Sequence, residues 1–376
     1  MSGIYVHVPF CRKACHYCDF HFSTDVRYRE QMMRAIGQEA ELQSDNFKNI
    51  KPETLYFGGG TPTLVETKLL EMLMHSLKNR FDFSRIVETT IEANPEDLTA
   101  EKLSELQKLG VDRLSVGVQT FDEDTLQFLN RNHSGEQALE ALNRCRTAGY
   151  SNISVDLIFA IPGRTTEKLK NDLNILLTLA PEHISTYGLT VEHGTYFGHQ
   201  AAKGKFSAVD EEQNALEFEL IIETLTSAGY QQYEISNFCL PGRHSKHNSS
   251  YWKGEPYLGL GPGAHSFRDI YRQFNISNNH LYMQAIAEKI LPAAVEKLSL
   301  TDRINETVMT SLRTETGVSL TGLKEWSGYD LLKENNAVVK KMIEDSTALV
   351  VDDCLRLTRK GRMIADKITL DLFLEP

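Results

Sequence analysis

Over the first 230 residues, short runs of β-branched and aromatic residues alternate with longer segments in which apolar residues recur at helical spacing. This alternation is typical of βαβ units, in which crossover helices join parallel strands. The pattern predicts an α/β fold with a partial (β/α)6 TIM-like barrel, open on one side. The expected strands are Ile4–His7, Thr54–Phe57, Thr89–Ala93, Arg113–Val118, Ile153–Phe159 and Ile184–Leu189.

The segments between these strands are expected to form helices that cover the barrel. Leu103, Leu106 and Leu109 recur on one helix face, so we expect them in the core. Ser134 and Gln137 have the spacing of a capping box, which predicts the start of another helix. Each predicted strand ends in a polar or glycine-rich segment, and barrel-like α/β folds assemble their sites at this edge.

The pattern changes after about residue 235, where aromatic and glycine-rich sequence follows a predicted helix over residues 210–228. Helical spacing returns near residue 298, and TALVVDDCLRLT (347–358) predicts two short strands around an Asp-Asp turn. We therefore predict a barrel over residues 1–235, a connecting region over 236–297, and a small helical, winged-helix-like accessory domain over 298–376.

Charge and hydropathy argue against a nucleic-acid-binding protein and against a membrane-spanning one. The chain of 376 residues has 40 basic and 51 acidic residues, a net charge of -11, so the basic surface of a nucleic-acid-binding protein is not expected. No run approaches the about 18 apolar residues of a membrane span, and no signal peptide is recognised. We expect a cytoplasmic protein without a transmembrane segment, and peripheral membrane contact stays open.

Three of the six cysteines, Cys11, Cys15 and Cys18, form a C-x3-C-x2-C run directly after the first strand. A [4Fe-4S] cubane takes thiolate ligands, and three cysteines would leave one iron open to a small molecule. The alternative is a structural zinc site that adds His7 or His16 to the thiolates. The other cysteines are isolated and predicted to be buried: Cys145, Cys239 and Cys354.

The cysteine run, followed by GGGTPT at 58–63, resembles the radical S-adenosylmethionine (SAM) superfamily. The resemblance implies that the three cysteines hold the [4Fe-4S] cluster and that backbone groups of the glycine-rich element meet the SAM amino group. It also implies a set of SAM-contacting residues near the strand ends. These are Tyr5, Tyr17, Gly59, Gly60, Thr61, Glu92, Gln119, Arg131 and Asp156.

Further motifs place the resemblance in one subgroup and extend it over essentially the whole chain. IEANPEDLT, SVGVQTFDE, DLIFAIPGRT, HNSSYW and GLGPGAHSF are similar to segments of the oxygen-independent coproporphyrinogen III oxidase family and its branch of HemW-type heme chaperones. Ala160 departs from this pattern, because relatives commonly have glycine there, and makes that turn less permissive.

Two features favour the chaperone branch over the oxidase. Phe20 stands where the oxidase has a further cysteine, and the four residues before Tyr5 cannot build the oxidase's N-terminal lid. The H-N-x-x-Y-W motif implies heme contact by His247, Tyr251 and Trp252, with His244 and His265 as competing ligands.

The sequence therefore predicts a heme chaperone that binds a [4Fe-4S] cluster, SAM and heme and delivers heme to apo-hemoproteins. Oxidative decarboxylation of coproporphyrinogen through a 5′-deoxyadenosyl radical is the alternative. A plain histidine in a structural loop is the simplest alternative reading of His247.

Overall fold

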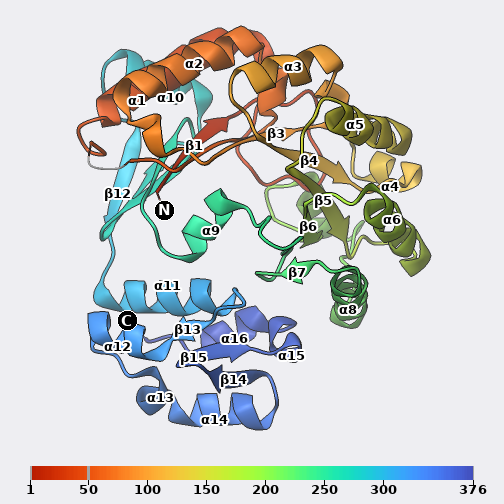
Figure 1. The fold of residues 1–376 in the computed structure, drawn as a ribbon, viewed down its shortest axis with the longest axis vertical. Helices are drawn as coiled ribbons and strands as arrows, with labels where there is room; N and C mark the ends of the chain where they lie inside the picture. Colours follow the sequence, from red (N-terminus) through yellow and green to blue (C-terminus); the bar gives the residue numbers. More distant parts are fainter. Residues whose placement is uncertain (1, 49–50, 376) are drawn as a thin grey trace.

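The computed structural model describes residues 2–48 and 51–375. Its centre is a curved, parallel six-stranded sheet in the order β1 to β6, within a larger sheet of 12 strands (Figure 1). The parallel strands are β1 (Gly3–Val8), β2 (Thr54–Gly59), β3 (Glu88–Ala93), β4 (Arg113–Gln119), β5 (Ile153–Phe159) and β6 (His183–Gly188). The predicted α/β partial barrel is confirmed, and the six predicted strands coincide with these.

Helices cover the outside of this barrel (Figure 1). Ile4, Val6 and Val8 of β1 point outward into the core under the helices, whereas Tyr5 and His7 point inward, as period-two alternation requires. The helices of residues 1–230 are α1 (Arg29–Gln43), α2 (Thr67–Arg80), α3 (Ala100–Lys108), α4 (Glu123–Phe128), α5 (Gly135–Thr147), α6 (Thr166–Leu179), α7 (Tyr196–Ala202), which packs against the cysteine loop, and α8 (Glu211–Ser227). The predicted capping box of Ser134 and Gln137 opens α5.

Residues 231–297 extend both edges of the same sheet. On one edge β9 (Tyr257–Leu260) runs parallel to β1 and leads into an antiparallel meander of β10 (His265–Arg268), β11 (Tyr271–Asn275) and β12 (Ala293–Lys297). On the other edge β8 (Asn237–Cys239) pairs antiparallel with β6, and β7 (Gln231–Gln232) pairs with β8. Helices α9 (Lys246–Trp252) and α10 (Asn279–Ala287) complete this region. The domain boundaries at residues 235 and 297 remain predictions.

The C-terminal domain has its own hydrophobic core below the barrel (Figure 1). Asp352 and Asp353 adopt φ values of 50° and 61° between β14 and β15, so the predicted Asp-Asp hairpin is present. Its elements are α11 (Leu300–Leu312), β13 (Val318–Ser319), α12 (Leu320–Ser327), α13 (Leu331–Glu334), α14 (Asn336–Glu344), β14 (Ala348–Val351), β15 (Cys354–Leu357), α15 (Arg359–Arg362) and α16 (Ala365–Asp371). Among the described helices, none combines the length and the apolar character needed to cross a bilayer.

The isolated cysteines follow the prediction in two of three cases. Cys145 and Cys239 are buried in the barrel, where they pack as small apolar residues. Cys354 is only partly buried, because it lies on a short strand at the surface of the C-terminal domain. The prediction of a buried Cys354 was therefore wrong.

A buried carboxyl group anchors the meander to the barrel. Glu39 of α1 accepts hydrogen bonds from the Gly261 amide (2.7 Å), the Asn275 side-chain amide (2.6 Å) and the Tyr282 hydroxyl (2.5 Å). Burial raises the pKa of Glu39 to about 7, against the effect of these three donors. Since Gly261, Asn275 and Tyr282 lie in the loop after β9, in β11 and in α10, one side chain fixes three segments.

We expect Glu39→Ala to lower the free energy of unfolding by about 3 kcal/mol, because it leaves three buried hydrogen-bond donors without an acceptor and opens a cavity. Urea unfolding followed by far-UV circular dichroism measures the change. Glu30→Ala on the same helix is the matched control, since the pair of Glu30 with Arg34 is exposed and screened by solvent and should contribute little to stability. Equal losses in the two variants would contradict the anchoring role.

Candidate functional site

The three cysteines of the C-x3-C-x2-C run lie together in the loop after β1, at the carboxyl ends of the strands. Backbone hydrogen bonds pin this loop, from the Cys11 amide to the Ser23 carbonyl (3.0 Å) and from the His16 amide to the Leu129 carbonyl (3.1 Å). Burial, together with the neighbouring thiols, raises the pKa of Cys11 to about 12 and that of Cys18 to about 11. The three sulfur atoms therefore form one interacting group on the wall of a cavity of about 480 Å³.

The spacing of these ligands bears on the choice between cluster and zinc. Within residues 2–48 and 51–375, no group of three or more His, Cys, Asp or Glu side chains is arranged to hold a single metal ion. Zinc binds all its ligands at about 2.0–2.3 Å from one centre, whereas a cubane presents a separate iron to each thiolate. Three thiols are the ligands that a cubane takes, and both ring nitrogens of His7 are already engaged, by the Tyr5 hydroxyl and the His21 carbonyl.

The glycine-rich element packs directly against the cysteine loop. The Gly60 amide donates to the Val8 carbonyl (2.9 Å) and the Thr61 amide to the Phe10 carbonyl (2.7 Å). A Cβ atom on Gly60 would lie 2.6 Å from the carbonyl oxygen of Phe10, and Gly59 has a φ of 107°. Glycine is required at both positions by close approach and by backbone conformation.

Two carboxyl groups face the same cavity. Glu92 accepts hydrogen bonds from the Tyr56 hydroxyl (2.9 Å) and the Gly59 amide (3.1 Å), and burial raises its pKa to about 7. Burial also raises the pKa of Asp156, to about 6, while a hydrogen bond from Ser185 opposes the shift. Both groups thus titrate near neutral pH, which is typical of carboxyl groups in functional sites.

Arg131 connects the cysteine loop to the strand ends. Its guanidinium donates to Cys15 Sγ (3.4 Å), to the Gly117 carbonyl (2.6 Å) and to Asn94 Oδ1 (2.6 Å). Asn94 Nδ2 in turn donates to the Thr61 hydroxyl (3.0 Å). Asn94 was not predicted as a site residue, although its place in EANPED, directly after the third strand, was a usable signal.

Most of the predicted SAM residues share this cavity. Its lining includes Tyr17, Gly59, Gly60, Thr61, Glu92, Gln119, Arg131 and Asp156 beside the three cysteines, and also Asn94, Ser115 and Tyr187, which sequence reasoning missed. Gln119 has a left-handed φ of 70° at a bulge between β4 and β5, a strained conformation of the kind found at binding sites. Tyr5 does not line this cavity, because it lies lower in the barrel and faces a second one.

That second cavity, of about 970 Å³, lies between the open side of the barrel and the C-terminal domain. Tyr251 and Trp252 line it, as do residues of β10, β11, α11 and α12. Asp19 and Phe20 line both cavities, so the two adjoin at the end of the cysteine loop. Phe20, at 72% exposure, is the most exposed large apolar side chain among the described residues.

His247 does not face this larger cavity. It is 1% exposed inside the barrel, where Nδ1 is hydrogen-bonded to Thr54 Oγ1 and Nε2 to the Tyr251 hydroxyl, both at 2.8 Å. Burial lowers its pKa to about 3, and its ring stacks on Tyr56 at 5.0 Å. The geometry therefore speaks against the predicted bond from His247 to a heme iron, because both nitrogens are already engaged.

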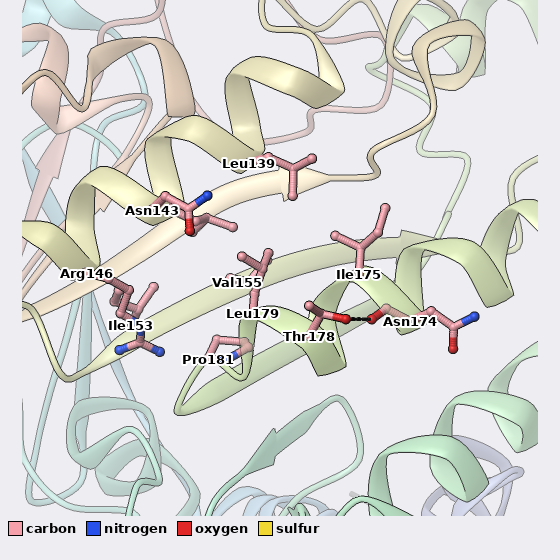
Figure 2. A pocket seen from close by; sticks show the side chains of 11 residues that line it. Leu139, Asn143, Arg146, Ile153, Val155, Asn174, Ile175, Thr178, Leu179 and Pro181 are labelled. Atoms are coloured by element: carbon pink, nitrogen blue, oxygen red, sulfur yellow. Dashed lines mark hydrogen bonds between the residues drawn. The ribbon is translucent and has the colours of Figure 1, made fainter.

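A third hollow lies on the outer surface, between α5 and α6 and over β5 (Figure 2). Figure 2 shows Leu139 and Asn143 on one side and Ile175 and Thr178 on the other. Its lining is mostly apolar and contains no carboxylate or cysteine. This hollow is separate from the strand ends and offers none of the groups expected for SAM or a cluster.

Comparison with known proteins matches residues 5–176 to the radical SAM superfamily and residues 298–364 to the HemN C-terminal domain. The chain is 36% identical to the heme chaperone HemW of Bacillus subtilis over 98% of each chain. It is 37% identical to HemW of Lactococcus lactis over 84% of this chain and 83% of the relative. The structure of coproporphyrinogen III oxidase (HemN) from Escherichia coli superposes with a TM-score of 0.85 at 24% identity, over 99% of this chain and 90% of that one, a likeness of fold.

Proposed function

The chain belongs to the radical SAM superfamily, within the family of the heme chaperone HemW, and from this premise we propose that it carries heme to apo-hemoproteins in the cytoplasm. In this proposal Cys11, Cys15 and Cys18 hold a [4Fe-4S] cluster, and SAM binds in the adjoining cavity. Heme is the cargo of the protein.

The chain's own residues fit this assignment. Gly59, Gly60 and Thr61 present backbone groups toward the amino-acid end of SAM, while Asp156 and Gln119 offer polar partners to its ribose hydroxyls, which need such partners when buried. Arg131 and Asn94 hold the cysteine loop in register with these strand ends. When bound, a cluster with one open iron and SAM would supply one-electron chemistry to the site.

The observation that carries the proposal is that the cluster cavity adjoins a larger cavity with aromatic and cationic walls. Tyr251, Trp252, Tyr257 and Phe267 give that cavity flat apolar surfaces, which suit a porphyrin. Asp19 and Phe20 stand at the junction. A cargo in the larger cavity would therefore lie beside the cluster site without sharing its ligands.

The same adjacency supports one alternative, oxidative decarboxylation of coproporphyrinogen. Phe20 argues against it, because the resemblance puts a cysteine of the oxidase at this position. We expect no formation of protoporphyrinogen IX when the reconstituted protein is incubated anaerobically with SAM, a reductant and coproporphyrinogen III. Chromatography of the oxidised porphyrins measures the outcome.

A second experiment tests whether the protein transfers heme to an apo-hemoprotein. The protein loaded with hemin is mixed with an excess of an apo-globin, and we expect the absorption spectrum of the holo-globin to develop faster than it does with hemin bound to serum albumin. Decarboxylated product in the first arm would establish the oxidase instead. Absence of heme binding would overturn the chaperone proposal.

A further inference from the structure

The larger cavity contains three histidines, and their hydrogen bonds distinguish them. His7 is engaged at both ring nitrogens, by the Tyr5 hydroxyl (3.2 Å) and by the carbonyl oxygen of His21 (2.8 Å). His21 Nε2 donates to Asn279 Oδ1 at 2.8 Å, and its ring is half-buried and stacked on His7, with the ring centroids 6.1 Å apart. His265, the first residue of β10, is exposed and forms no ring hydrogen bond to any described residue. Its nitrogen lone pair is therefore available to a metal ion.

The register of the meander places His265 beside useful neighbours. In the antiparallel pairing of β10 and β11, Phe267 lies opposite Arg272 and His265 opposite Phe274, so all four share one face. His265 and Arg272 are diagonal neighbours, which are separated by about 7–8 Å. Partial burial and the nearby guanidinium lower the pKa of His265, which keeps the imidazole in the neutral form that binds metals.

The opposite wall supplies a cation. Arg303 of α11 lines this wall and stacks over the ring of Trp326, with the guanidinium carbon 4.8 Å from the ring centroid. Arg272 already pairs with Glu306 at 2.8 Å. Stacking on Trp326 uses the face of the Arg303 guanidinium and holds it in place, so the N–H groups on its edge are the donors that suit an incoming carboxylate.

We propose that the larger cavity is the heme site, with His265 as the ligand of the iron and Arg303 as the partner of a propionate. The inference rests on the proposed function, because it assumes that heme is the cargo. The chemistry of the walls matches each part of that molecule: imidazole for iron, guanidinium for carboxylate and aromatic rings for the macrocycle. His247 then acts as a positioning residue, since its Nε2 fixes the Tyr251 hydroxyl on the cavity wall.

The test is a titration of the full-length protein with hemin, followed by the Soret absorption band. We expect His265→Ala to weaken hemin binding at least about tenfold and to shift the Soret band, and added imidazole to restore the wild-type spectrum. Metal-free protoporphyrin IX should bind the variant and the wild type alike, because it has no iron to lose. His244→Ala is the matched control, since His244 is also exposed but lies outside the cavity lining.

A second variant tests the role of Arg303 in binding a propionate. Arg303→Ala should weaken binding of hemin by about tenfold while leaving the affinity for hemin dimethyl ester unchanged, because the ester has no free carboxylate. An unchanged Soret band in His265→Ala, or a change confined to His247→Ala, would overturn the site while leaving the chaperone function intact. Failure of the wild type to bind hemin would overturn the proposed function and this site together.

Discussion

Replacing Cys15 by serine is expected to leave the reconstituted protein with almost none of its iron and acid-labile sulfide. A hydroxyl is a harder and weaker ligand for iron than a thiolate, and the C-x3-C-x2-C run provides only three thiolates. Cys15 also accepts the 3.4 Å hydrogen bond from Arg131, which places its sulfur beside the residue that joins the cysteine loop to the strand ends. Iron analysis and the broad visible absorbance after anaerobic reconstitution measure the loss.

Cys354→Ser is the control for this experiment. Cys354 is partly exposed on β15 of the C-terminal domain, outside the cysteine loop, so its replacement should leave the iron content unchanged. Circular dichroism should show a folded barrel in both variants, because the cysteine loop contributes little to the core. A Cys15→Ser protein with the iron and absorbance of the wild type would remove this residue from the cluster site.

Glu92→Gln is expected to weaken SAM binding by about 10- to 100-fold. SAM carries a sulfonium and an ammonium group, and the buried Glu92 carboxylate lies beside the Gly59 amide, where we propose that the amino-acid end of SAM binds. Glutamine keeps the size of the side chain and its hydrogen bond from Tyr56 but removes the charge. Equilibrium dialysis with labelled SAM at about pH 8 measures the affinity.

The pH dependence gives Glu92 a second signature. Because its pKa in the ligand-free protein is about 7, the carboxylate that attracts a cation is present above this pH and is lost as the pH falls through it. Wild-type affinity should therefore fall about tenfold between about pH 8 and about pH 6, and Glu92→Gln should flatten this dependence. For stability the sign is reversed: a carboxyl group with a raised pKa stabilises the ligand-free fold fully below its ordinary value of 4.5, and this contribution is lost as the pH rises through about 7.

Glu88→Gln serves as the comparison, because Glu88 is a buried carboxyl group on the same strand, at the end away from the cysteines. It accepts hydrogen bonds from the Lys246 and His247 amides and does not line the SAM cavity. Its replacement should leave SAM affinity within about twofold of the wild type. Equal losses in Glu88→Gln and Glu92→Gln would show that any lost barrel charge has this effect.

The six barrel strands could be predicted because their signal is local. Runs such as Ile153–Phe159 are β-branched, apolar and bounded by polar turns, so sequence neighbours suffice to identify them. The meander of β10, β11 and β12 was missed because its strands are short, polar and stabilised by pairing with one another and with β9. Strand propensity depends on such partners more than on the residues themselves.

The direction in which a side chain points also depends on distant residues and could not be predicted from the sequence. His247 was expected at a cofactor, yet its ring is bonded to Thr54, which is 193 residues away along the chain. No local pattern shows that a histidine in a loop-like motif turns into a barrel. Asn94, in contrast, lay within a quoted motif and was missed because its partners Thr61 and Arg131 come from other strand ends.

At Ala160, in contrast, the sequence alone indicated the backbone conformation. Its departure from the glycine common in relatives indicated a turn that alanine fits poorly. The structure places Ala160 at a left-handed φ of 55°, with its amide bonded to Glu217 Oε2 at 2.8 Å. An alanine in this conformation costs about 1 kcal/mol, so the substitution is tolerated at a modest loss of stability.

The barrel and the C-terminal domain keep separate hydrophobic cores, and Ile235 is a side chain that packs against both. Polar contacts also cross the junction, from the Ile235 amide to the Arg313 carbonyl and from the Glu315 amide to the Tyr233 carbonyl, each at 3.0 Å, and in the ion pair of Arg272 with Glu306 at 2.8 Å. Because each part has its own core, we expect two cooperative unfolding units, which one melting temperature does not describe. A ligand bound both to His265 of the barrel sheet and to Arg303 of the C-terminal domain would couple the unfolding of the two units. We then expect one unfolding transition for the protein with heme and two for the protein without it.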